Sequence, residues 1–449
     1  MAAHPAPAAP PPAQPAAPDA LAVLRSKGYL RLLLLSALIG VPVSVAAYGF
    51  LALVSWLQTL LYTALPQALG FAQPPAWWPV PLLTLAGVLV ALCIRFLPGT
   101  GGHPPSEGFA ADGYPLPTEL TGVVLAALTG LTLGVVLGPE APLIALGGGL
   151  GALALRLIKK DSPPSAVAVI ASAGSFAAVS TLLGSPLLGA FLLMEASGLA
   201  GAMLGVGLLP GLLAAGIGSL VFVGLDSWTG LGTFSLALPE LPGFGQPTLV
   251  MFLWAIVLGV VCALLSWGIT FVGRGLRPRV DRHRLVVTPV VGLLVGALAM
   301  LFTLITGRDS ALVLFSGQSA LPGLIQDGAG WPLGTLAVLI LCKALAYGLS
   351  LSAFRGGPVF PAMFLGAALG VATSQLPGME LVPAVGIGIG AMCVSMLRLP
   401  LTSVLLATVL LTVDAAAVMP LVIVAVVVAH VLTARLPALP GARRTKATA

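Results

Sequence analysis

The chain has 449 residues, of which 58% are hydrophobic and only 8% are charged. Soluble domains carry about 25% charged residues, so this chain cannot cover a water-facing surface with polar groups. Apolar runs long enough to cross a bilayer core of roughly 30 Å recur along it, for example at Leu285–Leu304 and Val418–Leu432. The runs do not alternate with polar residues as transmembrane strands do. The composition therefore predicts an all-α polytopic membrane protein, since a helix pairs its own backbone groups in lipid.

The positions of the basic residues indicate membrane topology. They gather at Arg25–Arg31, Arg156–Lys160, Arg274–Arg284 and Arg435–Lys446, between or beside apolar spans. Cytoplasmic loops have this distribution under the positive-inside rule. A nucleic-acid site is the alternative for a net charge of +6, but no aromatic residues are interleaved with the charges as a base-stacking surface requires. We therefore expect a multi-pass protein of the cell membrane with both termini in the cytoplasm.

Three regions follow one another along the chain. Residues 1–28 form a Pro/Ala-rich tail that we predict to be disordered, and residues 436–449 form a basic tail. Residues 29–435 are predicted to form a transmembrane domain, with a first repeat at about 29–225 and a second at about 248–435. Apolar spans are predicted near 31–64, 80–97, 119–137, 140–158, 165–183, 186–200, 202–224, 248–273, 285–306, 333–353, 359–375, 382–397, 401–413 and 417–434. Several are too short to cross at 1.5 Å per residue, so we expect broken helices that end inside the membrane.

An internal repeat is the most informative feature of the sequence. Residues 138–151 (GPEAPLIALGGGLG) and 357–370 (GPVFPAMFLGAALG) match at seven of 14 positions with a constant offset of 219. Chance in a chain rich in Gly, Leu and Pro is the alternative, but seven ungapped matches favour duplication. Sequence identity leaves open whether the two halves run parallel or inverted.

Each copy of the repeat has the composition of a helix start. Both begin Gly-Pro with a second proline three residues later, and proline is tolerated in a first helical turn because its missing N–H would be unpaired there. A helix start presents free N–H groups and a partial positive charge, which together attract anions. Two such starts facing each other would replace an anion's hydration shell without a full positive charge. The later glycines of each copy are expected to let helices pack closely.

Three acidic residues lie in apolar surroundings, namely Glu140, Glu195 and Asp414. An intramembrane carboxylate is costly and is a functional-site hypothesis by default. Glu140 follows Gly138-Pro139, so its carboxylate is expected to occupy the anion site until it is protonated or displaced. The alternative is that Glu140 merely caps its helix. Glu195 is interpreted as a hydrogen-bonded structural carboxylate, and Asp414 as an N-cap of the final helix.

These segments resemble motifs of the CLC family of chloride channels and chloride/proton antiporters. Gly138–Pro142 resembles that family's G-K/R-E-G-P motif, whose glutamate is the external gate. Gly357–Pro361 is similar to its G-I-F-x-P motif, and Thr100–Pro104 is a weaker match to G-S-G-I-P. The segment from Ser185 to Glu195 resembles A-P-L-x-G-x-x-F-x-x-E. The resemblance implies a homodimer of inverted repeats with one pathway per subunit for chloride or a similar anion.

The resemblance also implies a set of site residues, some of which depart from the family pattern. The gate would be Glu140, and the anion-binding residues would be Gly101, Gly102, Gly138, Gly357, Val359 and Phe360, with Thr100, Pro358 and Glu195 in support. Gly101 replaces the family's anion-binding serine, so a backbone N–H or Thr100 would substitute for it. Pro358 has no N–H to donate, which moves coordination to the two residues after it.

Three functions remain open at this stage. Ala196 stands where antiporters have an internal proton-transfer glutamate, and no tyrosine follows Tyr347 to line the inner mouth. These departures favour a passive channel gated by Glu140 over an anion/proton antiporter. An intramembrane enzyme is disfavoured because the chain has only four scattered histidines and no H-E-x-x-H or Cys-x-x-Cys pattern. No metal or other cofactor is expected.

Overall fold

The protein is described here by a computed structural model that covers residues 20–109, 113–183, 185–197, 202–236, 238, 241–411 and 415–439. Over these residues the chain is helical, without a named strand, as predicted. The predicted tails lie mostly outside the described residues. The first described helix starts at Ala20 and the next at Lys27, so helical structure begins before residue 29, where the transmembrane domain was expected to start.

The helices occur in the same order in both halves of the chain. The first half contains α2 (Lys27–Thr59), α4 (Pro79–Phe96), α5 (Pro117–Leu133), α6 (Glu140–Ile158), α7 (Pro164–Ala178), α8 (Pro186–Ala196) and α9 (Ala202–Thr229). The second half contains α10 (Leu249–Arg282), α11 (Arg284–Thr306), α13 (Leu333–Ala353), α14 (Val359–Ser374), α15 (Leu381–Leu397), α16 (Pro400–Leu410) and α17 (Ala415–Arg435). The short elements are α1 (Ala20–Leu24), η1 (Leu60–Ala64), α3 (Leu65–Ala68), η2 (Pro98–Gly101), η3 (Pro105–Glu107), η4 (Ser310–Leu312), α12 (Leu321–Gln326) and η5 (Gly328–Gly330).

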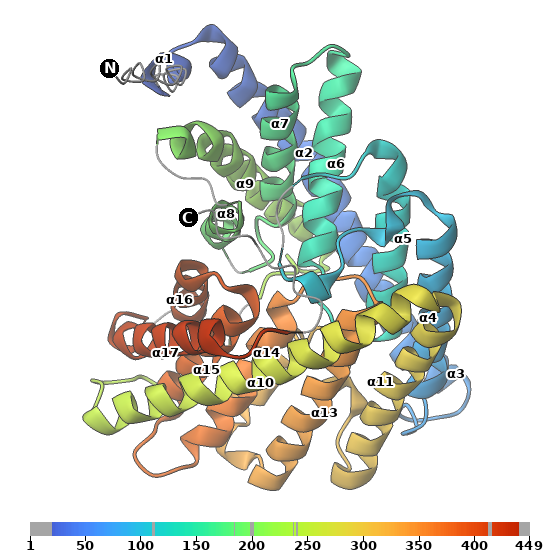
Figure 1. Ribbon diagram of the computed structural model, residues 1–449, viewed down its shortest axis with the longest axis vertical. Coiled ribbons are helices and arrows are strands. Elements are labelled where there is room, and N and C mark those ends of the chain that lie inside the picture. The colour runs from blue at the N-terminus through green and yellow to red at the C-terminus, as the bar shows by residue number, and fades with distance from the viewer. Residues whose placement is uncertain are drawn as a thin grey trace, which may run out of the picture.

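Equivalent helices make equivalent contacts in the two halves. Helix α2 packs on α9 as α10 packs on α17, and α6 packs on α7 as α14 packs on α15. In Figure 1, α6, α7 and α9 lie in the upper part of the molecule and α13, α14 and α15 in the lower part. The halves meet where α4 packs on α11 and α8 packs on α16.

The two halves are inverted relative to each other where the repeated segments touch. Gly138 and Gly357 form an isolated antiparallel bridge in which each N–H donates to the other residue's carbonyl at 2.7 Å. These glycines are equivalent positions of the repeat, so equivalent segments run in opposite directions. The structure therefore resolves the parallel-or-inverted choice in favour of inversion.

Glycines allow the closest helix contacts in both halves. A Cβ placed on Gly147 of α6 would lie 2.4 Å from the Gly174 carbonyl oxygen of α7. A Cβ on Gly366 of α14 would lie 2.3 Å from the Gly388 carbonyl oxygen of α15. Because any side chain would collide with the facing backbone, these helix pairs depend on glycine, as predicted.

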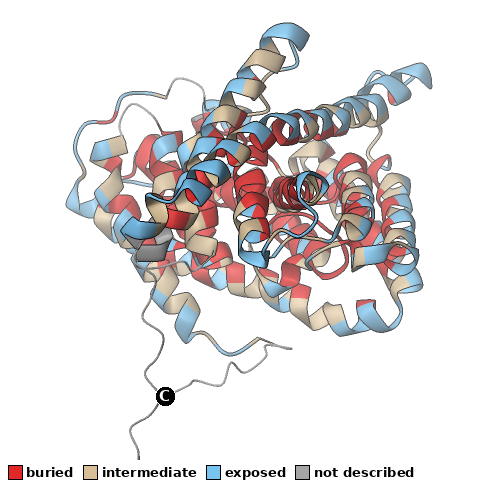
Figure 2. Ribbon diagram, turned by 90° about the horizontal axis from the view of Figure 1, so that it is seen from above, coloured by how far each residue is buried: buried red, intermediate tan, exposed pale blue. Residues whose placement is uncertain are grey.

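The lengths of the helices bear out the prediction of broken helices. Among the described residues, eight helical segments are long and apolar enough to cross a membrane, whereas six apolar helices have only 10–17 residues. The short helices include α14 and α15, which are almost entirely buried, and Figure 2 shows the buried residues gathered inside the molecule. The outer faces of α10 and α11 expose large apolar side chains such as Leu253 and Leu293, the surface that lipid requires.

One basic segment differs from the prediction. Arg274–Arg284 was expected to be a loop, but α10 continues nine residues beyond the predicted end of its span and stops at Arg282. The break falls at His283, and Asp281 spans it by pairing with Arg277 at 2.7 Å and Arg284 at 2.5 Å. The Asp281–Arg284 pair joins the end of α10 to the start of α11, whereas the Arg277–Asp281 pair lies within α10. The apolar pattern missed this extension because the last turns of α10 are polar.

Candidate functional site

Two helix N-termini face each other at the bridge between the halves. Pro139 precedes α6 with φ −82° and ψ −7°, and Pro358 precedes α14 with φ −91° and ψ −5°. Equivalent residues thus adopt nearly the same conformation, so the repeat in sequence is also a repeat in local structure. The bridge brings the free N–H ends of both helices to one place inside the protein, which favours negative charge there.

The Glu140 carboxylate lies between these two helix starts. Its residue is 0% exposed, and its Oε1 accepts a hydrogen bond from the Val359 N–H at 2.5 Å. The backbone N–H groups of Glu140 itself and of Phe360 also interact with the carboxylate, while its Oε2 has no hydrogen-bond partner among the described residues. A residue of the first half therefore places its carboxyl group on the helix start of the second half.

The residues expected to bind an anion divide into two groups in the structure. Val359 and Phe360 are buried at the start of α14 and present their N–H groups to Glu140. The N–H groups of Gly138 and Gly357, by contrast, are occupied by the bridge, so these glycines hold the helix starts together instead of offering donors. That pairing was invisible in the sequence because it joins residues 219 positions apart.

Thr100, Gly101 and Gly102 form a tight turn after α4. Thr100 and Gly101 have φ of 50° and 72°, and the Gly102 N–H donates to the Gly99 carbonyl at 2.9 Å. Gly101 is buried, and a Cβ there would lie 2.9 Å from Ile94 Cγ1 and 3.3 Å from Arg355 Cγ. Glycine at 101 is thus favoured by the left-handed backbone and by the close approach of Ile94.

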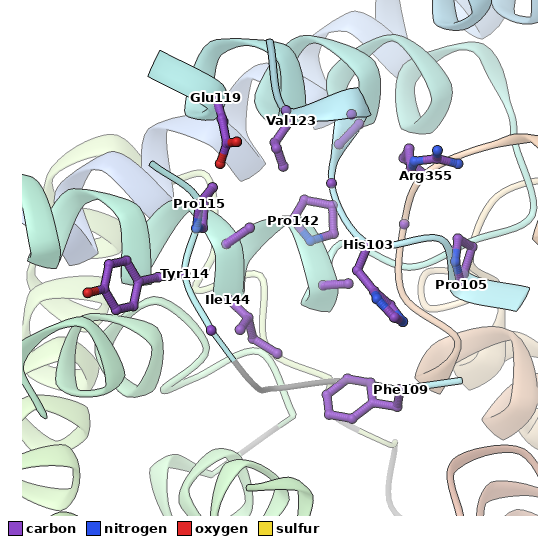
Figure 3. A pocket seen from close by; sticks show the side chains of 18 of the residues that line it. His103, Pro105, Phe109, Tyr114, Pro115, Glu119, Val123, Pro142, Ile144 and Arg355 are labelled. Carbon is purple, nitrogen blue, oxygen red and sulfur yellow. The ribbon is translucent and has the colours of Figure 1, made fainter. Parts of the chain in front are cut away.

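A cavity of about 290 Å³ lies beside this turn (Figure 3). Its walls come from the turn at 99–103, from described residues of the segment that follows it, from α5, from the first two turns of α6, and from the segment 355–358 that leads into α14. Gly101, Gly102 and Pro358, all predicted site residues, line it. The cavity therefore connects the predicted first-half and second-half segments, although they are far apart in sequence.

Glu195 makes the contacts of a structural carboxylate. Its Oε1 accepts from the Leu401 N–H at 3.0 Å, and its Oε2 accepts from the Thr402 N–H at 2.7 Å and from the Thr402 hydroxyl at 2.6 Å. These groups belong to the first turn of α16, whose own preceding residue, Leu399, supplies no side-chain cap. Glu195 thus caps a helix of the other half. Asp414 lies outside the described residues.

Sequence reasoning missed three buried polar side chains near the site. Tyr347 of α13 donates its hydroxyl to the Pro358 carbonyl at 2.8 Å, directly behind the start of α14. Arg355 is 4% exposed and lines the cavity, and Lys343 is fully buried in α13. Lys343 and Arg355 were detectable as rare charges in an apolar stretch, but their surroundings depend on contacts distant in sequence.

The fold and site together define a class of membrane protein. Inverted repeats with broken helices that meet at a buried site are the architecture of transporters and related channels. The sequence model of the family described as "Voltage gated chloride channel" matches residues 107–434, most of the chain. The chain belongs to this family, the CLC family of anion-transport proteins.

Individual relatives and solved structures agree with this assignment. YfeO of Escherichia fergusonii, a candidate ion-transport protein, is 31% identical over 381 residues, covering 82% of this chain and 84% of the relative. YfeO of Escherichia coli K12 is 29% identical over 384 residues with the same coverage. The structure of a CLC-type fluoride/proton antiporter aligns with a TM-score of 0.69 and 17% identity, covering 90% of this chain and 95% of that chain. A slow cyanobacterial Cl⁻/H⁺ antiporter gives a TM-score of 0.69 and 20% identity over 91% and 96% of the two chains. These likenesses establish the shared fold.

Proposed function

We propose that this protein is a passive channel for chloride or similar small anions, gated by the Glu140 carboxylate. The observation that carries the proposal is the hydrogen bond from the Val359 N–H to Glu140 Oε1. A carboxylate in that position takes the donors that a permeating anion would use. An anion can enter only when the carboxylate leaves or loses its charge.

The direction of the pH dependence follows from this competition. An ionised Glu140 is attracted to the two helix starts and closes the pathway. A protonated carboxyl group has no net charge and binds N–H donors more weakly, so it yields to an anion. Anion flux is therefore expected to rise as the pH falls.

The test is anion efflux from vesicles containing the purified protein, at neutral and acidic pH. Glu140→Gln is expected to give high flux at both pH values, because glutamine cannot ionise. Glu380→Gln is the matched control, since Glu380 is exposed and its side chain makes no capping hydrogen bond to the helix that follows it. It should keep the wild-type pH dependence. If Glu140→Gln also keeps it, Glu140 is only a helix cap.

An anion/proton antiporter is the second candidate, because the two solved antiporters share this fold. A proton route usually needs several ionisable groups in sequence. Among the described residues, Glu140 is the one fully buried carboxylate. Glu195, the residue before Ala196, already accepts three hydrogen bonds. This arrangement supports the channel. Proton uptake in fixed proportion to chloride, measured in the same vesicles under a chloride gradient, would establish the antiporter instead.

The assembly and orientation are part of the same proposal. We propose a homodimer in the cell membrane, with both termini in the cytoplasm and one pathway in each subunit. The basic segments at Arg156–Lys160 and Arg274–Arg284 support this orientation through the positive-inside rule. Cross-linking of single-cysteine variants in vesicles tests the dimer, and labelling of the two termini from either side of the membrane tests the orientation.

A further inference from the structure

A second cavity lies where α4 and α10 end and α11 begins. It measures about 480 Å³, within the range of roughly 300–1,000 Å³ that is usual for sites of small molecules. Its walls come from residues 94–95 of α4, 281–283 at the end of α10, and 284–286 of α11. None of these residues lines the cavity beside Gly101, so the second cavity is a separate site.

The antiparallel packing of α4 on α11 builds the walls of this cavity. A Cβ on Gly87 of α4 would lie 2.5 Å from the Pro289 Cα of α11, and a Cβ on Gly296 of α11 would lie 2.7 Å from the Val80 Cα of α4. Residue numbers thus rise along one helix as they fall along the other, which brings the end of α4 beside the start of α11. Because the two backbones touch, the walls are held in place without a ligand.

The cavity carries an excess of positive charge. Arg95, Arg282 and Arg284 line it, together with a single carboxylate, Asp281. Asp281 is paired with Arg277 and Arg284, so it does not compensate the other two arginines. Among the described residues, the guanidinium groups of Arg95 and Arg282 have no ion-pair or hydrogen-bond partner, and both residues are exposed. Their donors are therefore accessible to an anion.

Exposed apolar side chains place the cavity at the surface of the bilayer. Phe96, Leu285 and Val286 are 70%, 49% and 68% exposed, and the arginines 95 and 284 are their neighbours in the chain. Helices α4 and α11 are both long and apolar enough to span a membrane, and this is the end at which the one stops and the other starts. Arginines beside large apolar residues suit the boundary between lipid and water. In the proposed orientation this boundary belongs to the cytoplasmic leaflet, whose surface is negatively charged.

Helix dipoles account for only part of this arrangement. Arg95 lies in the last turn of α4 and Arg282 in the last turn of α10, where a cation offsets the partial negative charge of the helix end. Arg156 has the same kind of position in α6, but it lines neither of the two cavities. The end of α4 is distinguished by a second arginine from another helix and by the open cavity that the two share.

We propose that this cavity binds the phosphate of an anionic phospholipid headgroup, with Arg95 and Arg282 as its ligands. Guanidinium groups bind phosphate through charge-assisted hydrogen bonds, and basic pockets between membrane helices suit anionic headgroups. A free phosphate ion would satisfy the same arginines, but it would leave the apolar residues beside them without a partner. The exposed apolar side chains therefore favour a lipid. Lipid binding here is independent of the anion pathway proposed above.

Photo-crosslinking of the wild-type protein tests the location. The full chain is placed in phosphatidylcholine vesicles that contain a small fraction of phosphatidylglycerol with a photoreactive group at the start of one acyl chain. Mass spectrometry then maps the modified residues. We expect modification at the end of α4 and at residues 281–286, and much less from a phosphatidylcholine probe with the same group. Equal yields from both probes, or phosphatidylglycerol crosslinks only elsewhere, would overturn the proposal.

A double variant, Arg95→Gln with Arg282→Gln, gives the size of the effect. Native mass spectrometry measures the preference for phosphatidylglycerol over phosphatidylcholine, which should fall by about tenfold or more, the contribution of a charge-assisted hydrogen bond. Lys159→Gln with Lys160→Gln removes the same charge from exposed residues outside the cavity. It should leave the preference nearly unchanged, because distant exposed charges are screened by salt. Equal losses in both double variants would show only the general attraction of a basic surface and contradict a specific site.

Inorganic phosphate separates a lipid site from a site for a soluble anion. Phosphate added to the wild-type protein should displace little phosphatidylglycerol, since it lacks the acyl chains. Complete displacement by phosphate would replace the lipid by a free phosphate ion. Both arginines are exposed, so the thermal unfolding of the Arg95→Gln, Arg282→Gln variant should match that of wild type. The crosslinking test uses no variant, so it decides the proposal even if the arginines also support the fold.

Discussion

The two copies of the repeated segment share a backbone but differ in the charges within or just before them. In the first copy Glu140 begins α6, and the equivalent residue of the second copy is Val359. Arg355 stands two residues before the second copy, and the equivalent residue before the first copy is Val136, which is fully buried. The acid and the base thus come from different halves of the chain.

This difference separates what the fold requires from what the site requires. The glycine bridge, the prolines before each helix and the close helix pairs occur in both copies, because both must pack in the same way. The charged residues occur once each, because a charge buried twice would double its desolvation cost. Equivalent mutations should therefore have equal effects on packing and unequal effects on the site.

The largest loss of stability is expected at the glycine contacts between helices, which occur in both halves. Gly147→Ala and Gly366→Ala should each lower the free energy of unfolding by about 3 kcal/mol, because the new Cβ would collide with a carbonyl of the facing helix. Denaturant titration in detergent measures both. Gly216→Ala is the control, since nothing lies within 4 Å of a Cβ on that exposed helical residue. A large difference between the first two variants would contradict equivalent packing.

A smaller loss of stability is expected at Tyr347, which contacts only the second copy of the repeat. Tyr347→Phe removes the donor to the Pro358 carbonyl and leaves it unpaired in a buried place. The expected loss is about 2 kcal/mol of unfolding free energy. The equivalent first-copy residue is Leu128, which has no polar group to lose, so Leu128→Met should cost less. Equal losses in thermal-unfolding measurements on the two variants would show that the hydroxyl contributes nothing.

The smallest loss of stability is expected at Glu195, a first-half residue that caps helix α16 of the second half. Helix α8 is capped by Ser185, which precedes it, whereas α16 is capped by Glu195 from the first half. Glu195→Gln keeps an acceptor but loses the charge, so stability should fall by about 1 kcal/mol. Anion flux and its pH dependence should not change. A shift in the pH dependence of efflux would show that Glu195 takes part in transport.

Most of the fold followed from local patterns. Apolar runs located nearly all the membrane helices, since lipid leaves a spanning segment few alternatives to a helix. The Gly-Pro starts of α6 and α14 were predicted because proline fixes φ and suits a first turn. The polar extension of α10 was missed, since it carries an ion pair within the helix and one across His283 in place of an apolar periodicity.

The sequence by itself determined that this is a helical membrane protein, that it contains a repeat, and that Glu140 is an unusual charge at a helix start. Only the tertiary structure decided that the repeats are inverted, that Gly138 and Gly357 use their N–H groups on each other, and that no carboxylate among the described residues pairs with Arg355. Helix formation depends on neighbours within one turn, so composition and spacing reveal it. Charge pairing depends on groups far apart in the chain, so only their positions in space reveal which charges are paired.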